Sequence, residues 1–311
     1  MKVAVLAGGV GGARFVRALL TSAPETSVTV VANVGDDLEV HGLHVSPDLD
    51  TLLYTLSGLA DDARGWGRAD ETWNARETLE LLGEETWFQL GDRDLGLHLA
   101  RTDALARGEP LSAITRRFAE ALALPVTLLP ATDERLRTKV VAPLGELEFQ
   151  DWFVRRGHRD PVTGIRFDGA AEARPAPGVV EAIESADAIL IAPSNPFVSI
   201  DPIVAVARIR DALVRRSAPS IAVSPLIGGR AVKGPAQAMF ERLAGGTSAA
   251  DVARCYAGLI DALAFDEADA DDAEAVAELG IEPIVTRTLL SDPDVPRDLV
   301  PRLLAVAGAA A

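Results

Sequence analysis

The chain has 311 residues, with 30 Lys or Arg against 46 Asp or Glu, so its formal net charge is −16. This acidic balance argues against general binding to nucleic acids or anionic membranes, because attraction to phosphates requires a basic surface. One cysteine, Cys255, excludes an internal disulfide framework and a zinc site made only of cysteines. No run of about 18 apolar residues is present, and the N-terminal apolar run is too short for a secretory signal. We therefore expect a soluble, cytoplasmic protein.

Apolar runs of strand length alternate with amphipathic stretches of helix length along most of the chain. Val3–Ala7 predicts a buried strand, and Gly11–Leu20 predicts the helix that follows it. Further strands are predicted at Val28–Ala32, Ala188–Ala192, Ile221–Val223, Ala262–Phe265 and Ile284–Thr286. Nearly continuous apolar strands separated by helices indicate a parallel sheet that is covered on both faces. The predicted fold is therefore α/β, a doubly wound, mostly parallel, Rossmann-like sheet with its functional crevice outside the carboxyl ends of the strands.

Residues 48–124 depart from this alternation and predict a helical insertion, a subdomain within one domain that spans residues 1–311. We expect its helices at Leu49–Leu59, Asp70–Leu82, Leu95–Ala106 and Leu111–Leu122. Asp70 is the predicted N-cap of the second helix, and Gly83 and Gly108 are predicted to end helices.

Two later segments carry weaker patterns. After the insertion, a small antiparallel addition is predicted from strands at Val126–Leu129, Lys139–Ala142 and Glu146–Val154. Asp266–Glu282 contains eight acidic residues and no basic one, a pattern that predicts a solvated helix or loop.

Four glycines stand within five positions directly after the first predicted strand: Gly8, Gly9, Gly11 and Gly12. Glycines at this place let backbone N–H groups approach a phosphate, and the N-terminus of the following helix favours an anion. The run matches neither a dinucleotide fingerprint, which requires glycine where Arg14 stands, nor a P-loop. A tight strand-to-helix turn is the alternative, but two glycines would be enough for it. We favour a ligand-binding turn.

Acidic residues follow the second predicted strand and open the next helix. Asp36 and Asp37 come after Asn33 at the end of the strand, where a carboxylate often meets a ribose hydroxyl; a simple Gly-Asp turn is the alternative. Asp48 and Asp50 open the helix, where one acid could serve as a cap. Two carboxylates near a phosphate site indicate a hard divalent cation, usually Mg²⁺.

Three further polar loops carry candidate residues. Trp87–Asp94 combines aromatic, amide and charged groups that could face a flat aromatic ligand, although its acids could also only cap a helix. Pro193–Pro196 and Ser224–Arg230 each follow a predicted strand, and either could be an ordinary turn. Together, these loops place polar groups on one rim of the sheet, which favours a common site.

These motifs occur in this order in the 2-phospho-L-lactate transferase family of coenzyme F420 biosynthesis, and the chain resembles that family over nearly its whole length. The motifs are the glycine turn and the segments Asn33–Asp37, Ser46–Thr51, Leu90–Asp94, Pro193–Pro196 and Ser224–Gly229, with the likeness continuing through Thr288–Leu290. Arg64–Trp73 and Gln150–Arg155 look most similar to the actinobacterial branch, which is associated with an enolpyruvyl rather than a lactyl donor.

The resemblance implies transfer of a phospho-lactyl or phospho-enolpyruvyl group from a GDP-linked donor to the ribityl hydroxyl of the deazaflavin Fo. GMP leaves, and F420-0 or dehydro-F420-0 forms. It further implies Mg²⁺ at Asp48 and Asp50, either of which could instead face the acceptor hydroxyl, with Asp50 able to serve as base. The implied substrate-binding residues are Gly8, Gly9, Gly11, Gly12, Asn33, Asp36, Asp37, Thr51, Gln89, Arg93, Ser194, Asn195, Pro196, Ser224, Gly228 and Gly229. Of these, Gln89 and Arg93 would face the deazaflavin; we also expect a homodimer.

Three other functions are weighed against this one. A sugar nucleotidyltransferase also pairs a glycine-rich turn with carboxylates and magnesium, but Gly12-Ala13-Arg14 departs from its usual continuation. A non-catalytic nucleotide-sensing regulator on the same fold would need neither the carboxylate pair nor the deazaflavin-side loop. A nicotinamide oxidoreductase is disfavoured by Arg14 and by the lack of an obvious proton donor.

Overall fold

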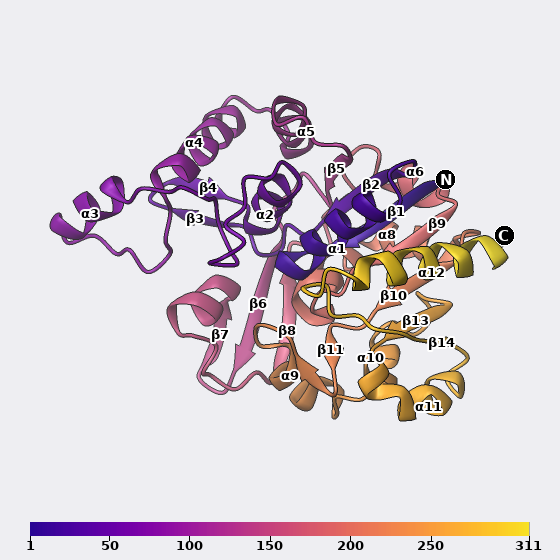
Figure 1. Cartoon of the computed structure of the whole chain (residues 1–311). Coiled ribbons are helices and arrows are strands. Elements are labelled where there is room, and N and C mark those ends of the chain that lie inside the picture. The colour runs from indigo at the N-terminus through magenta and orange to yellow at the C-terminus, as the bar shows by residue number, and fades with distance from the viewer. Residues whose placement is uncertain (311) are drawn as a thin grey trace.

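Seven parallel strands form the central sheet of the structure, a computed structural model that describes residues 1–310 and side-chain exposure as far as residue 308 (Figure 1). The strand order is β14-β13-β10-β9-β1-β2-β5, and every neighbouring pair is parallel. The bounds are β1 Lys2–Ala7, β2 Ser27–Ala32, β5 Thr127–Pro130, β9 Ala188–Ile191, β10 Ser220–Val223, β13 Ala262–Phe265 and β14 Glu282–Val285. This arrangement confirms the predicted doubly wound α/β sheet.

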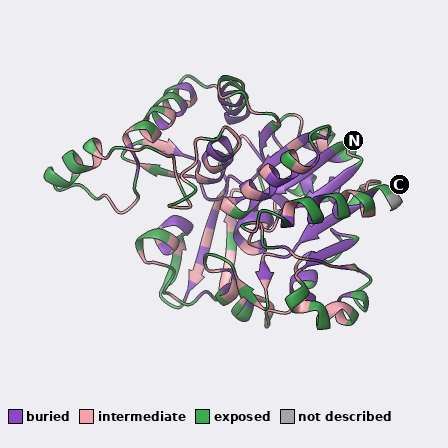
Figure 2. Ribbon diagram, viewed as in Figure 1, coloured by how far each residue is buried: buried purple, intermediate pink, exposed green. Residues whose placement is uncertain are grey.

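The middle of the sheet is buried on both faces, as its uninterrupted apolar strands predict (Figure 2). β1 pairs with β2 on one side, with Val3 opposite Val28, and with β9 on the other, with Val3 opposite Ala188. From β1 the chain continues outward through β2 to β5, and it returns through β9 to build the other half. The order therefore reverses between β1 and β9, the place where open α/β sheets bind ligands.

Helices on the sheet include α1 (Gly9–Ser22), which packs against α2 (Pro47–Leu56) and against the C-terminal helix α12 (Val295–Ala310). The remaining helices of this part are short: α6 Val179–Glu184, α7 Asp201–Val204, α8 Ala207–Arg215, α9 Ala236–Met239, α10 Ala249–Cys255 and α11 Ala273–Ala277. Within the described residues, no helix is both long enough and apolar enough to cross a membrane.

The predicted helical segment contains four helices: α2 Pro47–Leu56, α3 Asn74–Leu81, α4 Asp92–Ala106 and α5 Leu111–Ala121. Gly83 and Gly108 adopt φ of +80° and +85° just after α3 and α4, so both predicted helix ends are confirmed. The predicted N-cap Asp70 is wrong, because α3 begins at Asn74 and Asp70 lies before it with φ of +56°. Asp92 supplies the cap instead: its carboxylate accepts from the backbone N–H groups of Asn74 and Ala75, both at 3.0 Å.

The small antiparallel sheet differs from its prediction at both ends. It comprises β6 (Arg137–Ala142) between β7 (Gly145–Glu148) and β8 (Gly164–Asp168), whereas the strand predicted at Val126–Leu129 is β5 of the main sheet. The strand predicted at Glu146–Val154 is also wrong in its second half. There the chain turns into the π-helical segment Asp151–Arg155, whose Trp152 packs into a small core beside Phe149.

Two short hairpins complete the fold: β3 (Leu38–Val40) with β4 (Leu43–Val45), and β11 (Leu226–Ile227) with β12 (Arg230–Ala231). The acidic segment after β13 is a 3-10 helix, Glu267–Asp272, leading into α11, and it lies at the surface. The prediction of a solvated helix or loop there is confirmed.

Candidate active site

A cavity of about 600 Å³, here called the site cavity, opens where the strand order of the sheet reverses. One wall comes from the sheet rim, with Gly8, Gly9 and Asn195, and another from α2 and α4. The third wall comes from the small sheet and its π-helical segment, with Phe149 and Phe153. The cavity therefore gathers segments from the whole chain around one space.

The glycine turn has two parts with different surroundings. A β-carbon on Gly9 would meet nothing within 4 Å, and its φ of +65° favours glycine, so its backbone faces open space. A β-carbon on Gly11 would lie 2.8 Å from the carbonyl oxygen of Pro193, and one on Gly12 would lie 2.8 Å from Oγ of Ser194. Gly11 and Gly12 thus allow the Pro193–Asn195 loop to approach α1. Glycine is needed at these two positions for packing, whereas we expected from the sequence that a bound phosphate would require it.

The hydroxyl of Ser194 joins this loop to the glycine turn. Its Oγ donates to the carbonyl oxygen of Gly8 at 2.7 Å and accepts from the N–H of Gly8 at 3.3 Å. Asn195 uses its side-chain oxygen to accept from the N–H of Phe197 and begins the π-helical segment Pro196–Ile200. Ser194 and Pro196 therefore shape the rim from behind, while Asn195 itself lines the site cavity.

Asp48 is held at the cavity wall by Asn33. The side-chain amide of Asn33 donates to Asp48 Oδ2 at 2.9 Å and to the carbonyl oxygen of Val198 at 3.1 Å. Its oxygen accepts from the N–H of Gly35 at 2.7 Å, so this fully buried side chain is saturated by the protein. Burial, opposed by the Asn33 and Gly9 hydrogen bonds, raises the pKa of Asp48 to about 6. Asn33 therefore positions Asp48.

Asp36 lies beside Asp48 with less compensation. Its Oδ1 is buried and has no hydrogen-bond partner among the described residues. Burial, together with the neighbouring charge of Asp48, raises the pKa of Asp36 well above its ordinary value. Asp36 and Asp48 are thus two buried carboxyl groups without a positively charged partner. A bound cation would offset the cost of burying and ionising them.

Asp50, in contrast, forms a buried ion pair. Both of its oxygens accept hydrogen bonds from the guanidinium group of Arg101 on α4. Arg101 is only 1% exposed. The Asp50 carboxylate also accepts from the N–H of Ser46 at 3.3 Å. Although burial opposes it, the charge of Asp50 raises the pKa of Arg101, so the guanidinium group stays charged.

Three titratable side chains extend this ion pair along the cavity wall. The hydroxyl of Tyr54 donates to Asp94 Oδ1 at 2.5 Å, and His98 lies with Nδ1 3.7 Å from Asp50 and Nε2 3.1 Å from Asp94. Burial and the charges of Asp50 and Asp94 raise the pKa of Tyr54, which therefore stays protonated. Burial opposes ionisation of Asp94, but hydrogen bonds from His98 and Tyr54 hold its pKa below the ordinary value.

Asp37 is held through one of its two oxygens, Oδ2, whereas its buried Oδ1, like that of Asp36, has no hydrogen-bond partner among the described residues. Its Oδ2 accepts from the hydroxyl of Ser46 and lies against Nε2 of His44, both at 2.9 Å. His44 is on β4 and is only partly exposed. The β3–β4 hairpin, which the sequence analysis did not predict, therefore supplies a partner for the acidic motif.

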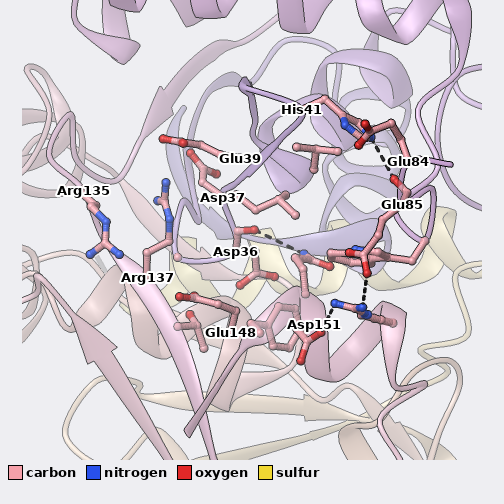
Figure 3. A pocket seen from close by; sticks show the side chains of 18 residues that line it. Asp36, Asp37, Glu39, His41, Glu84, Glu85, Arg135, Arg137, Glu148 and Asp151 are labelled. Atoms are coloured by element: carbon pink, nitrogen blue, oxygen red, sulfur yellow. Dashed lines mark hydrogen bonds and ion pairs between the residues drawn. The ribbon is translucent and has the colours of Figure 1, made fainter. Parts of the chain in front are cut away.

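A second cavity of about 760 Å³, the adjoining cavity, shares Asp36, Trp87, Phe149 and Gln150 with the site cavity. Figure 3 shows it with Arg135 and Arg137 on one side and Glu84 and Glu85 on the other. Arg155 pairs with Glu85 at 2.5 Å and Arg135 with Asp168 at 2.9 Å. Acids outnumber bases in this lining, and Asp36 stands between the two cavities.

Part of the lining of the site cavity is aromatic. Phe149 stacks on Phe153 with ring centroids 5.4 Å apart, and Trp87 meets Phe88 edge to face at 5.7 Å. Gln89 and Thr51 line the same cavity, as the sequence analysis expected of substrate-binding residues. A flat, partly polar ring system fits such a wall, since aromatic faces stack and a nearby amide orients the ring.

Several predicted binding residues lie away from the site cavity. Arg93 is exposed and 4.0 Å from Asp70, and Ser224 bonds within its own turn to Leu226. The N–H groups of Gly228 and Gly229 donate to the carboxylate of Asp269 at 2.9 and 3.0 Å, from the acidic segment. These glycine amides are therefore engaged by the protein itself in this conformation.

In the part of the chain that the structure describes, no group of three or more His, Cys, Asp or Glu side chains is arranged to hold a metal ion. Mg²⁺ is commonly bound by one or two carboxylates, with waters and substrate phosphates completing its shell. The orphaned oxygen of Asp36 beside Asp48 fits that mode, whereas Asp50 is already occupied by Arg101. Arg101 and His98 were not identified from the sequence, where an arginine and a histidine on a helix carry no distinguishing pattern, whereas Asp94 belongs to the predicted Trp87–Asp94 loop.

Comparison with known proteins gives a family and a fold. The family model described as "2-phospho-L-lactate transferase CofD" matches residues 3–288. The phosphoenolpyruvate transferase of Streptomyces coelicolor is 41% identical over 313 residues, covering 99% of this chain and 98% of the relative. That of Thermobifida fusca is 43% identical over 324 residues, covering 100% and 97%. A crystal structure of a Bacillus halodurans protein, described as a member of the UPF0052 family, superposes with a TM-score of 0.66 at 17% identity, over 97% of this chain and 99% of that one.

Proposed function

The chain belongs to the 2-phospho-L-lactate transferase family of coenzyme F420 biosynthesis, and from this premise we propose which group it transfers, and to what. The proposed acceptor is the deazaflavin alcohol Fo, and the proposed donor is a three-carbon acid linked through a diphosphate to guanosine. Relatives named phosphoenolpyruvate transferases favour the enolpyruvyl donor over the lactyl one. The product is then dehydro-F420-0, with F420-0 as the product of the lactyl donor.

One observation carries this proposal: a single cavity combines a glycine turn, an uncompensated acidic pair and an aromatic wall. The glycine turn at the start of α1 suits phosphates, because Gly9 leaves the backbone open there. The aromatic wall suits the flat deazaflavin ring, with Gln89 available to hydrogen-bond its polar edge. The two substrates would then meet near Asp36 and Asp48.

The reaction breaks the phosphoanhydride bond of the donor and forms a new phosphoester bond to the acceptor. The ribityl hydroxyl oxygen of Fo attacks the phosphorus nearest the three-carbon acid, and the bond from that phosphorus to the oxygen of GMP breaks. The hydroxyl proton is released, and the bridging oxygen leaves with GMP as a phosphate oxygen. Such a transfer depends mainly on orientation and on neutralising the charge of the phosphates.

Magnesium is part of the proposal, and Asp36 with Asp48 would hold it. When bound, the ion would neutralise phosphate charge and draw the donor toward the acidic pair. Asn33 fixes the orientation of Asp48, and the Asp50–Arg101 ion pair secures the first turn of α2 that carries it. The aromatic side chains that line the cavity would limit access of water to the bound donor and so its hydrolysis.

The test is to incubate the purified protein with Fo, Mg²⁺ and each of the two GDP-linked donors, and to identify the products by mass spectrometry. We expect a phosphodiester of Fo, with equimolar GMP, and faster formation from the enolpyruvyl donor. If a folded preparation that binds GDP forms no such product with either donor, the proposed function is wrong.

A further inference from the structure

Lys233 stands at the mouth of the site cavity, on the segment between β12 and α9. Among the described residues that line this cavity it is the only Lys or Arg, whereas Asp36, Asp48, Asp50 and Asp94 all line it. Of these acids, only Asp50 has an arginine partner. A diphosphate donor would bring further negative charge into this cavity, so a cation at its mouth is electrostatically significant.

The ammonium group of Lys233 has spare hydrogen-bonding capacity. Its Nζ donates to the carbonyl oxygen of Gly65 at 2.9 Å, and no carboxylate of the described residues lies within ion-pair distance of it. An ammonium group has three N–H donors, so two are left for another acceptor. The side chain is exposed, and it can therefore take an anionic partner without first breaking an ion pair.

The contact with Gly65 places Lys233 beside the glycine turn. Gly65 and Trp66 line a small cleft together with Val10 and Arg14 of α1, directly after the turn. A β-carbon on Gly65 would lie 2.7 Å from Nζ of Lys233, and Gly65 has φ of +77°, so glycine is needed there for this contact. Segments 60–68 and 230–235 therefore meet across the cavity mouth through one hydrogen bond.

Resting on the proposed function, we propose that Lys233 is a donor-binding residue that holds a phosphate of the GDP-linked substrate through its free N–H groups. The remaining N–H keeps its bond to Gly65, which ties the two mouth segments over the bound diphosphate. A cation held by Asp36 and Asp48, which line the same cavity, would neutralise charge on the same phosphates. The acceptor Fo carries no phosphate and would therefore make no use of this lysine.

Steady-state kinetics separate these roles. In Lys233→Gln, we expect the KM for the donor to rise about tenfold or more, since a charge-assisted hydrogen bond is lost, with the KM for Fo nearly unchanged. Arg230→Gln is the matched control: it removes one charge from the neighbouring strand β12, is exposed and does not line the cavity. Wild-type donor KM in a folded Lys233→Gln variant would overturn the proposal, as would an equal rise in Arg230→Gln.

A second measurement needs neither turnover nor a variant. The chain has three lysines, Lys2, Lys139 and Lys233, so acylation by an amine-reactive reagent can be followed at each by mass spectrometry. We expect saturating GDP to slow acylation of Lys233 several-fold while leaving exposed Lys2 unchanged. Unchanged acylation of Lys233 in protein that demonstrably binds GDP would overturn the proposal and leave the proposed function standing. Absence of any GDP binding would count against both.

Discussion

The acidic cluster around the start of α2 has two sides that differ in how the protein compensates their charge. On one side, Asp50 is paired with Arg101 and Asp37 is held by Ser46 and His44. On the other side, Asp36 and Asp48 have no cationic partner within the described chain, and both have raised pKa values. Burial alone does not explain the difference, since all four side chains are buried.

This contrast separates an acid that is paired within the protein, Asp50, from two acids that are left to bind a ligand, Asp36 and Asp48. The charge of a buried carboxylate that has its own arginine is compensated in the free protein, so this carboxylate needs no further ligand. A buried pair without a cation is costly in the free protein, and a divalent ion lowers that cost when the substrate phosphates bring it. We therefore propose that Asp50 stabilises the fold and that Asp36 and Asp48 bind the cation.

The largest expected effect is on stability and comes from removing the ion pair between Asp50 and Arg101. Arg101→Ala leaves Asp50 buried without its partner, so the free energy of unfolding should fall by about 3–5 kcal/mol, as measured by urea denaturation. Arg117→Ala, which removes an exposed ion pair with Glu109, should change it by less than about 1 kcal/mol. Equal stabilities of the two variants would show that the buried pair is dispensable.

Neutralising Asp36 or Asp48 should lower turnover rather than stability. Asp36→Asn and Asp48→Asn should each lower kcat/KM by about 10²–10³-fold, since charge stabilisation at the phosphates is lost. Their unfolding free energy should not fall, because a neutral amide removes repulsion in the buried pair and can still accept from Asn33 at position 48. Near wild-type rates at limiting Mg²⁺ would contradict the assignment.

Asp201, a half-buried carboxyl outside the cluster, shows the effect of burial on a pKa where no cation site is proposed. Burial raises the pKa of Asp201, at the start of α7, to about 7, although Arg210 opposes the shift. The folded protein then holds a proton that the unfolded chain releases near pH 4, so this group's contribution to stability falls as the pH rises from about 4 to about 7. Asp201→Asn should remove up to about 4 kcal/mol of that decline. Identical pH dependence in wild type and variant would refute this.

The glycine turn provides the smallest effects. Gly12→Ala should lower the free energy of unfolding by about 1–3 kcal/mol, because the new methyl group meets Ser194, and should leave GDP affinity in the folded fraction unchanged. Gly9→Ala should cost about 1 kcal/mol through its positive φ and should weaken GDP binding more than Fo binding. Calorimetric titration of both ligands checks this, and a larger loss of GDP affinity in Gly12→Ala would reverse the assignment.

The sequence predicted the sheet well because its buried strands are nearly pure apolar runs, a pattern with few other outcomes in an α/β chain. It predicted the site rim for a related reason: parallel strands end at one edge, so the residues after β1, β2 and β9 necessarily come together. It failed where a partner comes from far along the chain. Asp92 caps α3 in place of Asp70, and Arg101 neutralises Asp50 across 51 positions, neither of which local spacing encodes.

The most direct measurement of the central claim is calorimetric titration of GDP into the wild-type protein and into Asp36→Asn, each with and without Mg²⁺. We expect Mg²⁺ to strengthen GDP binding to the wild type about tenfold or more and to have little effect on Asp36→Asn, while Asp50→Asn, where folded, retains the Mg²⁺ effect. Strengthening by Mg²⁺ that survives in Asp36→Asn but is lost in Asp50→Asn would contradict this expectation and move the cation to the side that Arg101 occupies.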